Sequence, residues 1–455
     1  MCPLSDSASQ PTLLDELRCQ HNLMILGLIG LAVLYMLRVN LSVAIVAMVS
    51  HAEKVEYEGA FKESCPITES SNLIFNSISK NQKSIPKEGI NWNEKAQGRV
   101  LGSFFYGYFL TNFAGGRLAD KFGGKRVFGA GVLLTSVLAF FLPAAAQYSE
   151  KAFAFIRVLQ GMTEGVTFPS MNTLMSNWVQ PSRRALFMSR VTGGTIIGTV
   201  VTLSGGGWLA QTSFGWPCIF YLSGAIGLIY SLIWFHMVSD NPRTHSNVTE
   251  EERNLILQDL GHDKLFNDVE KSSQHTPWKK VFTSKPFIAV MVVHFGSSFG
   301  FYFLLTELPT YLSTVHHFDI KSNGLISSLP YMLMWILSVL YANQVHRLTS
   351  NKVLSIRMAR KISTSLGQFG PMVLLLCISL AGCNSLAAVT IICLAVGMSG
   401  FVQCGFFCGF QDLAPNYAGT ITGISNTIAS IAGVIAPRIT GFFKSRNSRP
   451  LVNGT

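Results

Sequence analysis

The sequence predicts an all-α membrane protein made of two six-helix pseudo-repeats, with the last helix missing, so that about 11 helices are present. Three observations predict this fold class. Only 13% of the 455 residues are charged, whereas a soluble domain has about 25%, and 49% are hydrophobic. The charged residues fall between long apolar stretches. A polar stretch at 239–285 separates six of these stretches from the remaining five.

Eleven segments meet, loosely, the requirement of roughly 20 apolar residues for a helix that crosses a bilayer. The first half contains the segments 22–49, 97–117, 126–147, 152–178, 185–211 and 215–238. The second half contains the segments 286–314, 322–345, 360–381, 386–411 and 417–443. The first segment is longer than the apolar core of a signal peptide, so we expect it to remain in the protein as a helix.

The distribution of charge predicts the orientation. Basic residues gather in short loops after the second, fourth and eighth segments, namely Arg117, Lys121, Lys125, Arg126, Arg183, Arg184, Arg347, Lys352, Arg357, Arg360 and Lys361. These loops share one side if the N-terminus is cytoplasmic, which is the positive-inside pattern. The loop 51–96 has six Lys against seven Glu, which suits the lumenal or extracellular face. The +11 net charge therefore reflects membrane topology, and we expect no nucleic-acid partner.

This reading divides the chain into a cytoplasmic tail (1–21), a first half (22–238, with the lumenal loop 51–96), a linker (239–285), a second half (286–443, five helices) and a polar tail (444–455). In the linker, Asn247 followed by an acidic turn predicts a short amphipathic helix. An odd number of helices leaves the basic residues of the tail on the outer side, against the positive-inside bias. We therefore expect a truncated or alternatively spliced C-terminus.

The loop after the second segment carries the most specific motif, Gly116-Arg-Leu-Ala-Asp120-Lys-Phe-Gly-Gly-Lys-Arg126. It resembles the signature G-x-L-A-D-R-x-G-R-K of the major facilitator superfamily, and the resemblance implies the major facilitator fold. Asp120 is expected either to cap a neighbouring helix N-terminus or to pair with a nearby Arg. We assign gating roles to Arg117, Asp120 and Lys121. The corresponding loop of the second half, 343–347, lacks the Asp, so no second latch is expected there.

Further strings resemble the sialin branch of the anion–cation symporter family, which also includes vesicular glutamate and sodium-phosphate transporters. They are Arg38-Val-Asn-Leu-Ser, Leu101-Gly-Ser-Phe-Phe-Tyr-Gly-Tyr, Arg157-Val-Leu-Gln-Gly-Met-Thr-Glu-Gly, Leu304-Leu-Thr-Glu-Leu-Pro and Asp412-Leu-Ala-Pro-Asn-Tyr-Ala-Gly. The resemblance implies a lysosomal, vesicular or plasma-membrane carrier. Two positions depart from the sialin pattern: Gln160 replaces a Glu, and Asn172 replaces a His.

Charged residues inside the apolar segments are the strongest site candidates, because a charge at mid-membrane costs roughly 2.5–3.5 kcal/mol or more. Arg38 and Arg157 are predicted to bind an anion, since a guanidinium holds carboxylate or phosphate in a two-point fork. Arg157 and Glu164 are seven residues apart and share one helix face. Glu164 is the predicted proton carrier and the predicted partner of Arg157. The alternative is a fixed Arg–Glu pair that only holds helices together.

The remaining candidates each have an ordinary structural alternative. Asn40, Tyr106, Tyr108 and Asn426 are expected to contact the substrate, although the two tyrosines would serve equally well in aromatic packing. His294 would titrate near neutral pH or form a satisfied buried histidine. Glu307, near the outer end of its helix, is a gate or an interface residue.

The predicted function is secondary active transport of small anions by alternating access, with sialic acid-like carboxylates or phosphate as substrate and H⁺ or Na⁺ as coupling ion. No zinc-binding spacing, P-loop or catalytic constellation is present, so neither an enzyme nor a bound cofactor or metal is expected. We expect a monomer in the lipid bilayer. The alternative is a non-transporting or dominant-negative truncated member of the same family.

Overall fold

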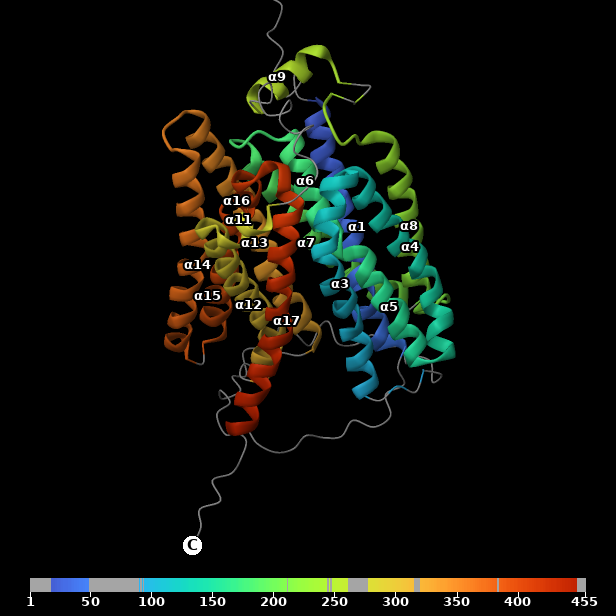
Figure 1. Ribbon diagram of the computed structural model, residues 1–455. Helices are drawn as coiled ribbons and strands as arrows, with labels where there is room; N and C mark the ends of the chain where they lie inside the picture. The colour runs from blue at the N-terminus through green and yellow to red at the C-terminus, as the bar shows by residue number, and fades with distance from the viewer. Residues whose placement is uncertain are drawn as a thin grey trace, which may run out of the picture.

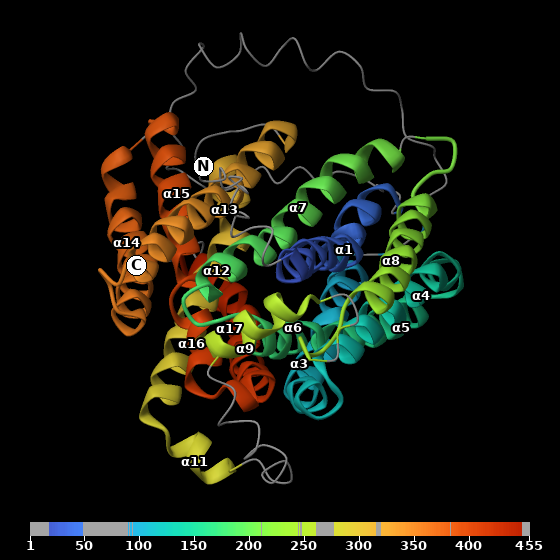
Figure 2. The same ribbon diagram turned by 90° about the horizontal axis from the view of Figure 1, so that it is seen from above.

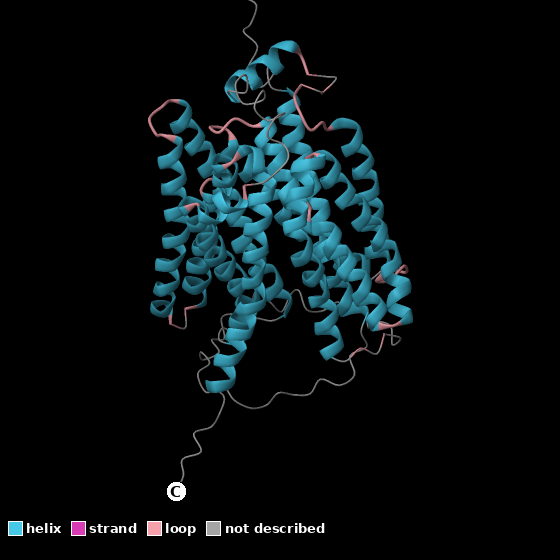
Figure 3. Cartoon of the chain, viewed as in Figure 1, coloured by secondary structure: helices cyan, strands magenta, loops and turns pink. Residues whose placement is uncertain are grey.

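A computed structural model describes residues 18–48, 90, 92, 94–210, 212–243, 245, 248–260, 277–314, 320–382 and 384–447. The described chain is built of helices arranged in two bundles that lie side by side (Figures 1, 2 and 3). The linker helix α9 covers one end of the molecule, and this end is called the linker side below. The predicted Asn247 cap and most of the loop 51–96 lie outside the described residues.

Each predicted segment of the first half coincides with one helix or with a broken pair. The helices are α1 (Arg18–Met48), α3 (Glu94–Phe122), α4 (Gly124–Tyr148), α5 (Glu150–Gly165), α6 (Thr167–Trp178), α7 (Arg184–Ala210) and α8 (Pro217–Met237). The fourth segment, predicted as continuous, is interrupted at Val166 between α5 and α6.

The second half repeats this pattern with five segments. Its elements are α12 (Lys285–Thr314), α13 (Ile320–Ser350), α14 (Ile356–Ala381), α15 (Ser385–Ser399), η2 (Gly400–Gln403), α16 (Phe406–Leu413), η3 (Pro415–Tyr417) and α17 (Ala418–Asn447). Here too the fourth segment is broken, by the 3₁₀ turn η2. The break at the same place in both halves supports the predicted internal repeat.

Seven of the described helices are long and apolar enough to cross a membrane by length and composition. They cover Arg18–Ile45, Gly124–Tyr148, Arg184–Ala210, Pro217–Met237, Lys285–Leu304, Ile356–Ile378 and Ser385–Leu413. The helices α3 and α5 are not among these seven, since α5 has only 16 residues and α3 is rich in glycine, tyrosine and other residues of low hydropathy. Of the charged residues in the predicted site, Arg157 and Glu164 lie on the short helix α5, and Arg38 lies on the apolar helix α1.

Glycines bring α3 and α5 close together. A Cβ atom at Gly161 would collide with the backbone oxygen of Phe104, and one at Gly107 would collide with that of Val158. Only glycine permits this backbone approach. It places the polar face of α5 directly against the aromatic residues of α3.

The linker is attached to the first half by two helix caps. Glu252 of α9 (Glu250–Leu260) accepts hydrogen bonds from the backbone N–H groups of Cys19 (2.9 Å) and Gln20 (3.3 Å) at the start of α1. Asp240 accepts from the N–H of Lys125 (2.7 Å) at the start of α4. A carboxylate at a helix N-terminus satisfies free N–H groups and the helix dipole. A second linker helix, α11 (Trp278–Thr283), leads into α12.

The two halves differ in how much of their apolar surface is covered. Half of the residues in the most apolar stretch of α1 and of α4 are buried. In the corresponding stretches of α12 and α14, 11% of the residues are buried. In the first half α8 packs against both α1 and α4, and Tyr230 donates to the carbonyl oxygen of Leu26. Among the described residues of the second half, no helix occupies the place that corresponds to α8.

Candidate functional site

A buried ion pair joins α1 to α5 at the centre of the first half. Nε and Nη2 of Arg38 lie 2.8 Å and 2.7 Å from Oε1 of Glu164. The Glu164 side chain is 1% exposed and that of Arg38 is 13% exposed. The sequence spacing predicted Arg157 as the partner of Glu164. The ion pair instead uses Arg38, because α1 brings its guanidinium against the same face of α5.

Arg157 binds neutral acceptors. Its guanidinium donates to Oε1 of Gln160 (3.0 Å) and to the carbonyl oxygens of Arg38 (3.1 Å) and Leu37 (3.5 Å). Gln160 in turn donates to the carbonyl oxygen of Thr135 (3.2 Å). Gln160, which replaces the Glu of the family pattern, therefore orients Arg157 without neutralising its charge.

The cluster has more positive than negative charge, and some of its polar atoms lack partners. Two guanidiniums face one carboxylate, so the three side chains sum to one positive charge. Oε2 of Glu164 and Nε of Arg157 are buried and have no hydrogen-bond partner within the described structure. A buried polar group without a partner costs about 1–3 kcal/mol. The cluster is thus electrostatically suited to receive an anion.

Aromatic rings surround the Arg38 guanidinium. Its central carbon lies 4.8 Å from the ring centroids of Tyr35 and Phe104 and 4.5 Å from that of Tyr108. Such contacts stabilise a desolvated cation by about 1–2 kcal/mol each. Sequence reasoning selected Tyr108 but missed Tyr35 and Phe104, although Phe104 and Tyr108 have the four-residue spacing that puts them on one helix face.

Tyr302 of α12 lies near Arg38, so the second half also reaches the site. Sequence reasoning did not select this tyrosine. The seventh segment contains several aromatic residues, and the spacing of Tyr302 does not distinguish it from the others.

Two of the predicted substrate contacts point elsewhere. Tyr106 is 67% exposed and lies outside the cluster, because two residues along a helix turn the side chain by about 200° from Tyr108. The same rotation separates Asn40 from Arg38. Asn40 is fully buried and donates to Oγ of Ser223 in α8 (3.1 Å).

The remaining candidates lie in the second half. Nδ1 of His294 is 2.8 Å from Oγ of Ser425, and its ring packs among phenylalanines of α16, which is the geometry of a satisfied buried histidine. Asn426 is partly buried in α17. Glu307 belongs to α12, but its side chain lies outside the described part of the structure.

The signature loop forms a contact between the halves. Asp120 accepts hydrogen bonds from the N–H groups of Gly419 (3.1 Å) and Thr420 (2.8 Å), and from the hydroxyls of Thr420 (2.5 Å) and Thr173 (2.9 Å). It therefore caps the N-terminus of α17, which is the first of the two predicted roles. Arg117 lies over the ring of Trp278 at 5.5 Å, and Lys121 lies 5.4 Å from the ring of Phe122.

A second ionic contact joins the halves at a place that the sequence did not indicate. Asp412 of α16 accepts from Arg184 of α7 (2.6 Å) and from Arg360 of α14 (2.9 Å). Arg360 also donates to the carbonyl oxygen of Pro181 (2.9 Å) in the first half. These contacts lie on the linker side, as does the Asp120 cap, and together they hold the halves closed there.

Comparison with known proteins gives a consistent set of relatives. A family model described as the Major Facilitator Superfamily matches residues 27–437. Human sialin is 36% identical over 420 residues, which cover 92% of this chain and 82% of sialin. A Drosophila ananassae protein provisionally named an inorganic phosphate cotransporter is 36% identical, with coverage of 93% and 85%. Vesicular glutamate transporter 3 of Danio rerio is 33% identical, with coverage of 98% and 72%.

Solved structures resemble the whole chain. The proton:xylose symporter XylE superposes with a TM-score of 0.67 at 14% identity, covering 94% of this chain and 90% of XylE. At this level of identity the likeness concerns the fold.

Proposed function

The chain belongs to the Major Facilitator Superfamily and is a multi-pass membrane protein, and from this premise we propose that it is a secondary active transporter of small anions. The predicted fold and the predicted sialin-like group are both confirmed by the comparisons. The substrate, the coupling ion and the roles of individual residues belong to the proposal.

The charge excess of the Arg38–Arg157–Glu164 cluster is the observation that carries this proposal. Two buried guanidiniums with one carboxylate are costly in the low dielectric of a membrane interior. An anion that enters the cluster adds the missing negative charge and an acceptor for the unpaired Nε of Arg157. A sugar without charge could accept a hydrogen bond but would not supply the negative charge.

A carboxylate is the proposed substrate group. The fork of a guanidinium matches the two oxygens of a carboxylate, and it also matches phosphate. The names of two relatives refer to glutamate and to inorganic phosphate, both anions. The aromatic rings around Arg38 add apolar surface, which favours an organic carboxylate over the more strongly hydrated phosphate.

Glu164 is the proposed coupling group. In this structure the carboxylate of Glu164 lies against the edge of the Arg38 guanidinium at which an anion would bind. Protonation of Glu164 removes its charge and frees Arg38, so proton and anion bind together. Arg157, held by the carbonyl oxygens of α1, contributes charge and positions Arg38.

Alternating access is proposed to occur by rocking of the halves. The Asp120 cap and the Asp412 ion pairs close the linker side, which the positive-inside pattern makes cytoplasmic. Substrate release on that side requires both contacts to break. The relatives support a vesicular or lysosomal membrane for this carrier.

Uptake into proteoliposomes tests the proposal. The purified chain would be supplied with labelled sialic acid, glutamate, urate or phosphate under imposed pH, sodium and voltage gradients. We expect a carboxylate to accumulate when protons move inward with it. Sodium-dependent uptake of phosphate would exclude the proposal that a carboxylate is transported together with a proton. If no anion accumulates under any gradient, the chain is a non-transporting member of the family.

A further inference from the structure

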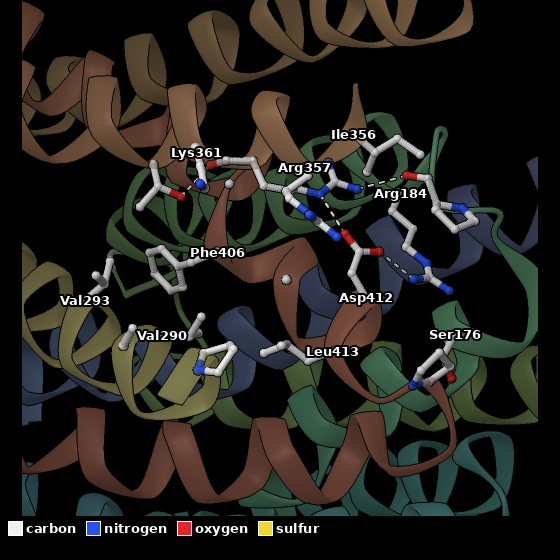
Figure 4. A pocket seen from close by; sticks show the side chains of 18 of the residues that line it. Ser176, Arg184, Val290, Val293, Ile356, Arg357, Lys361, Phe406, Asp412 and Leu413 are labelled. Atoms are coloured by element: carbon white, nitrogen blue, oxygen red, sulfur yellow. Dashed lines mark hydrogen bonds and ion pairs between the residues drawn. The ribbon is translucent and has the colours of Figure 1, made fainter. Parts of the chain in front are cut away.

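A groove lined mostly by the second half lies beside the ionic contact between the halves, and Arg184, Arg360 and Asp412 form part of its wall. It encloses about 990 Å³ on the linker side, between the first turns of α12 and α14 and the length of α16 (Figure 4). Its walls differ in chemistry. Basic side chains project from α14, and apolar side chains line α12 and α16.

The basic wall has positive charge without a matching carboxylate. Asp412 is already shared between Arg184 and Arg360. Arg357 and Lys361 are exposed at the groove, and among the described residues neither takes part in an ion pair. They are four residues apart, so they stand one above the other on the same face of α14.

The floor of the groove is apolar. Val290 and Val293 of α12 and Phe406 of α16 line it below the basic side chains (Figure 4). The apolar surface continues along α14 towards the membrane interior, where Phe369 is 62% exposed and Leu376 is 69% exposed. An occupant of this groove thus meets cations at one end and a hydrocarbon-like surface along the rest.

In the first half, α8 covers the face of α4 that corresponds to this face of α14. The fifth and sixth residues of α4 are Phe128 and Gly129, and Trp234 of α8 packs on Phe128 with 4.5 Å between ring centroids. The fifth and sixth residues of α14 are Arg360 and Lys361. Arg360 and Lys361 therefore stand at the positions where α4 offers α8 an aromatic ring and a glycine. They suit an anionic group attached to an apolar body.

We propose that this groove binds an anionic phospholipid. Arg357 and Lys361 hold the phosphate of the head group, and an acyl chain lies along Val290, Val293 and the exposed face of α14. In the proposed orientation the groove opens to the cytoplasmic leaflet, where anionic lipids are concentrated and basic pockets between helices bind their head groups. Arg357 and Lys361 take no part in the Asp412 ion pairs, so the site can be tested by lipid binding without a transport substrate.

Native mass spectrometry of the purified full-length chain tests the site, because it weighs whatever is bound. Dioleoyl phosphatidylserine, dioleoyl phosphatidylcholine and inorganic phosphate would be added separately. The test variant is Arg357→Gln with Lys361→Gln. The matched control is Lys279→Gln with Lys280→Gln on α11, because both lysines are exposed on the linker side and neither lines the groove. Thermal unfolding confirms that both variants are folded.

We expect phosphatidylserine to bind in preference to phosphatidylcholine, and the test variant to bind it about tenfold more weakly or worse, while the control variant is unchanged. Val293→Asn should weaken the binding of phosphatidylserine and leave that of inorganic phosphate unaltered. Equal binding of the two lipids, or equal binding by the test variant, would overturn the proposal. Displacement of the lipid by inorganic phosphate would identify a free-anion site instead. A bound polypeptide mass would identify a docked helix instead.

Discussion

Arg38 and Glu164 form an ion pair across 126 residues of sequence, with Nη2 of the arginine 2.7 Å from Oε1 of the glutamate. Oε1 of the carboxylate accepts a hydrogen bond from Nε of Arg38, whereas Nη2 of Arg38 and Oε2 of Glu164 have no hydrogen-bond partner within the described structure. The ion pair therefore uses only part of the hydrogen-bonding capacity of Glu164. A group that only held α1 to α5 would be stronger if both oxygens were used.

The first prediction concerns the titration of Glu164. Glu164→Gln keeps an oxygen that accepts from Arg38 but cannot ionise, so it imitates the protonated state permanently. Anion uptake should continue down its own gradient and lose its response to an inward proton gradient. Uptake into proteoliposomes with and without a pH gradient measures this response.

Glu150→Gln is the matched control for this experiment. Glu150 lies on the same helix α5 and pairs with Arg99 at 2.5 Å, but Arg99 is 61% exposed there. This variant should keep the full pH response. If Glu164→Gln retains proton-driven accumulation, Glu164 is a fixed structural partner of Arg38 and the coupling proposal is wrong.

The second prediction separates Arg157 from Arg38. Arg157→Lys removes the fork that reaches the carbonyl oxygens of Leu37 and Arg38, and it removes the guanidinium donor from Oε1 of the buried Gln160. The variant should lose about 1–3 kcal/mol of stability, seen as a lower midpoint of thermal unfolding. Arg99→Lys, in an exposed ion pair, should change the midpoint little. An unchanged midpoint for Arg157→Lys would show that these bonds do not position α1.

The sequence predicted the helices and the paired halves because apolar length and loop charge are local properties. It also predicted one role of Asp120 correctly, because a short signature loop fixes the turn on which that side chain sits. It did not predict which arginine meets Glu164. Spacing along one helix tells which residues share a face, but not what the neighbouring helix places against that face.

The same limit explains the other differences. Asn40 and Tyr106 were selected for their polarity and their proximity to Arg38 and Tyr108, yet a rotation of about 200° turns each away. Arg184 was counted only as a basic loop residue. Its partner Asp412 lies 228 positions away, and only the packing of the two halves brings them together.

The third prediction concerns the cap on α17. Asp120→Asn keeps the side-chain shape but removes the negative charge that faces the N–H groups of Gly419 and Thr420. Such a charge stabilises a helix N-terminus by about 0.3–2 kcal/mol, so the equilibrium should shift towards opening of the linker side. Spin labels at the exposed positions Met237 and Leu348, one in each half, should show a larger population of long distances. Glu150→Gln, which removes a carboxylate that pairs only within the first half, should leave the distribution unchanged, and an equal shift in both variants would contradict the cap.

The fourth prediction concerns the ion pairs of Asp412. Asp412→Asn leaves Arg184, whose side chain is 2% exposed, without a carboxylate, and an unpaired buried cation is costly. Asp412 itself is 23% exposed, so solvent screens part of the effect, and we expect a loss of about 2 kcal/mol in the closed form. A double-mutant cycle with Arg184→Gln, read from thermal unfolding midpoints, isolates the pairwise energy. The double variant should be about as stable as the less stable single variant, since the second substitution removes a cation that has already lost its partner. Strictly additive losses would show that Arg184 and Asp412 stabilise the protein independently, and that their contact does not hold the two halves together.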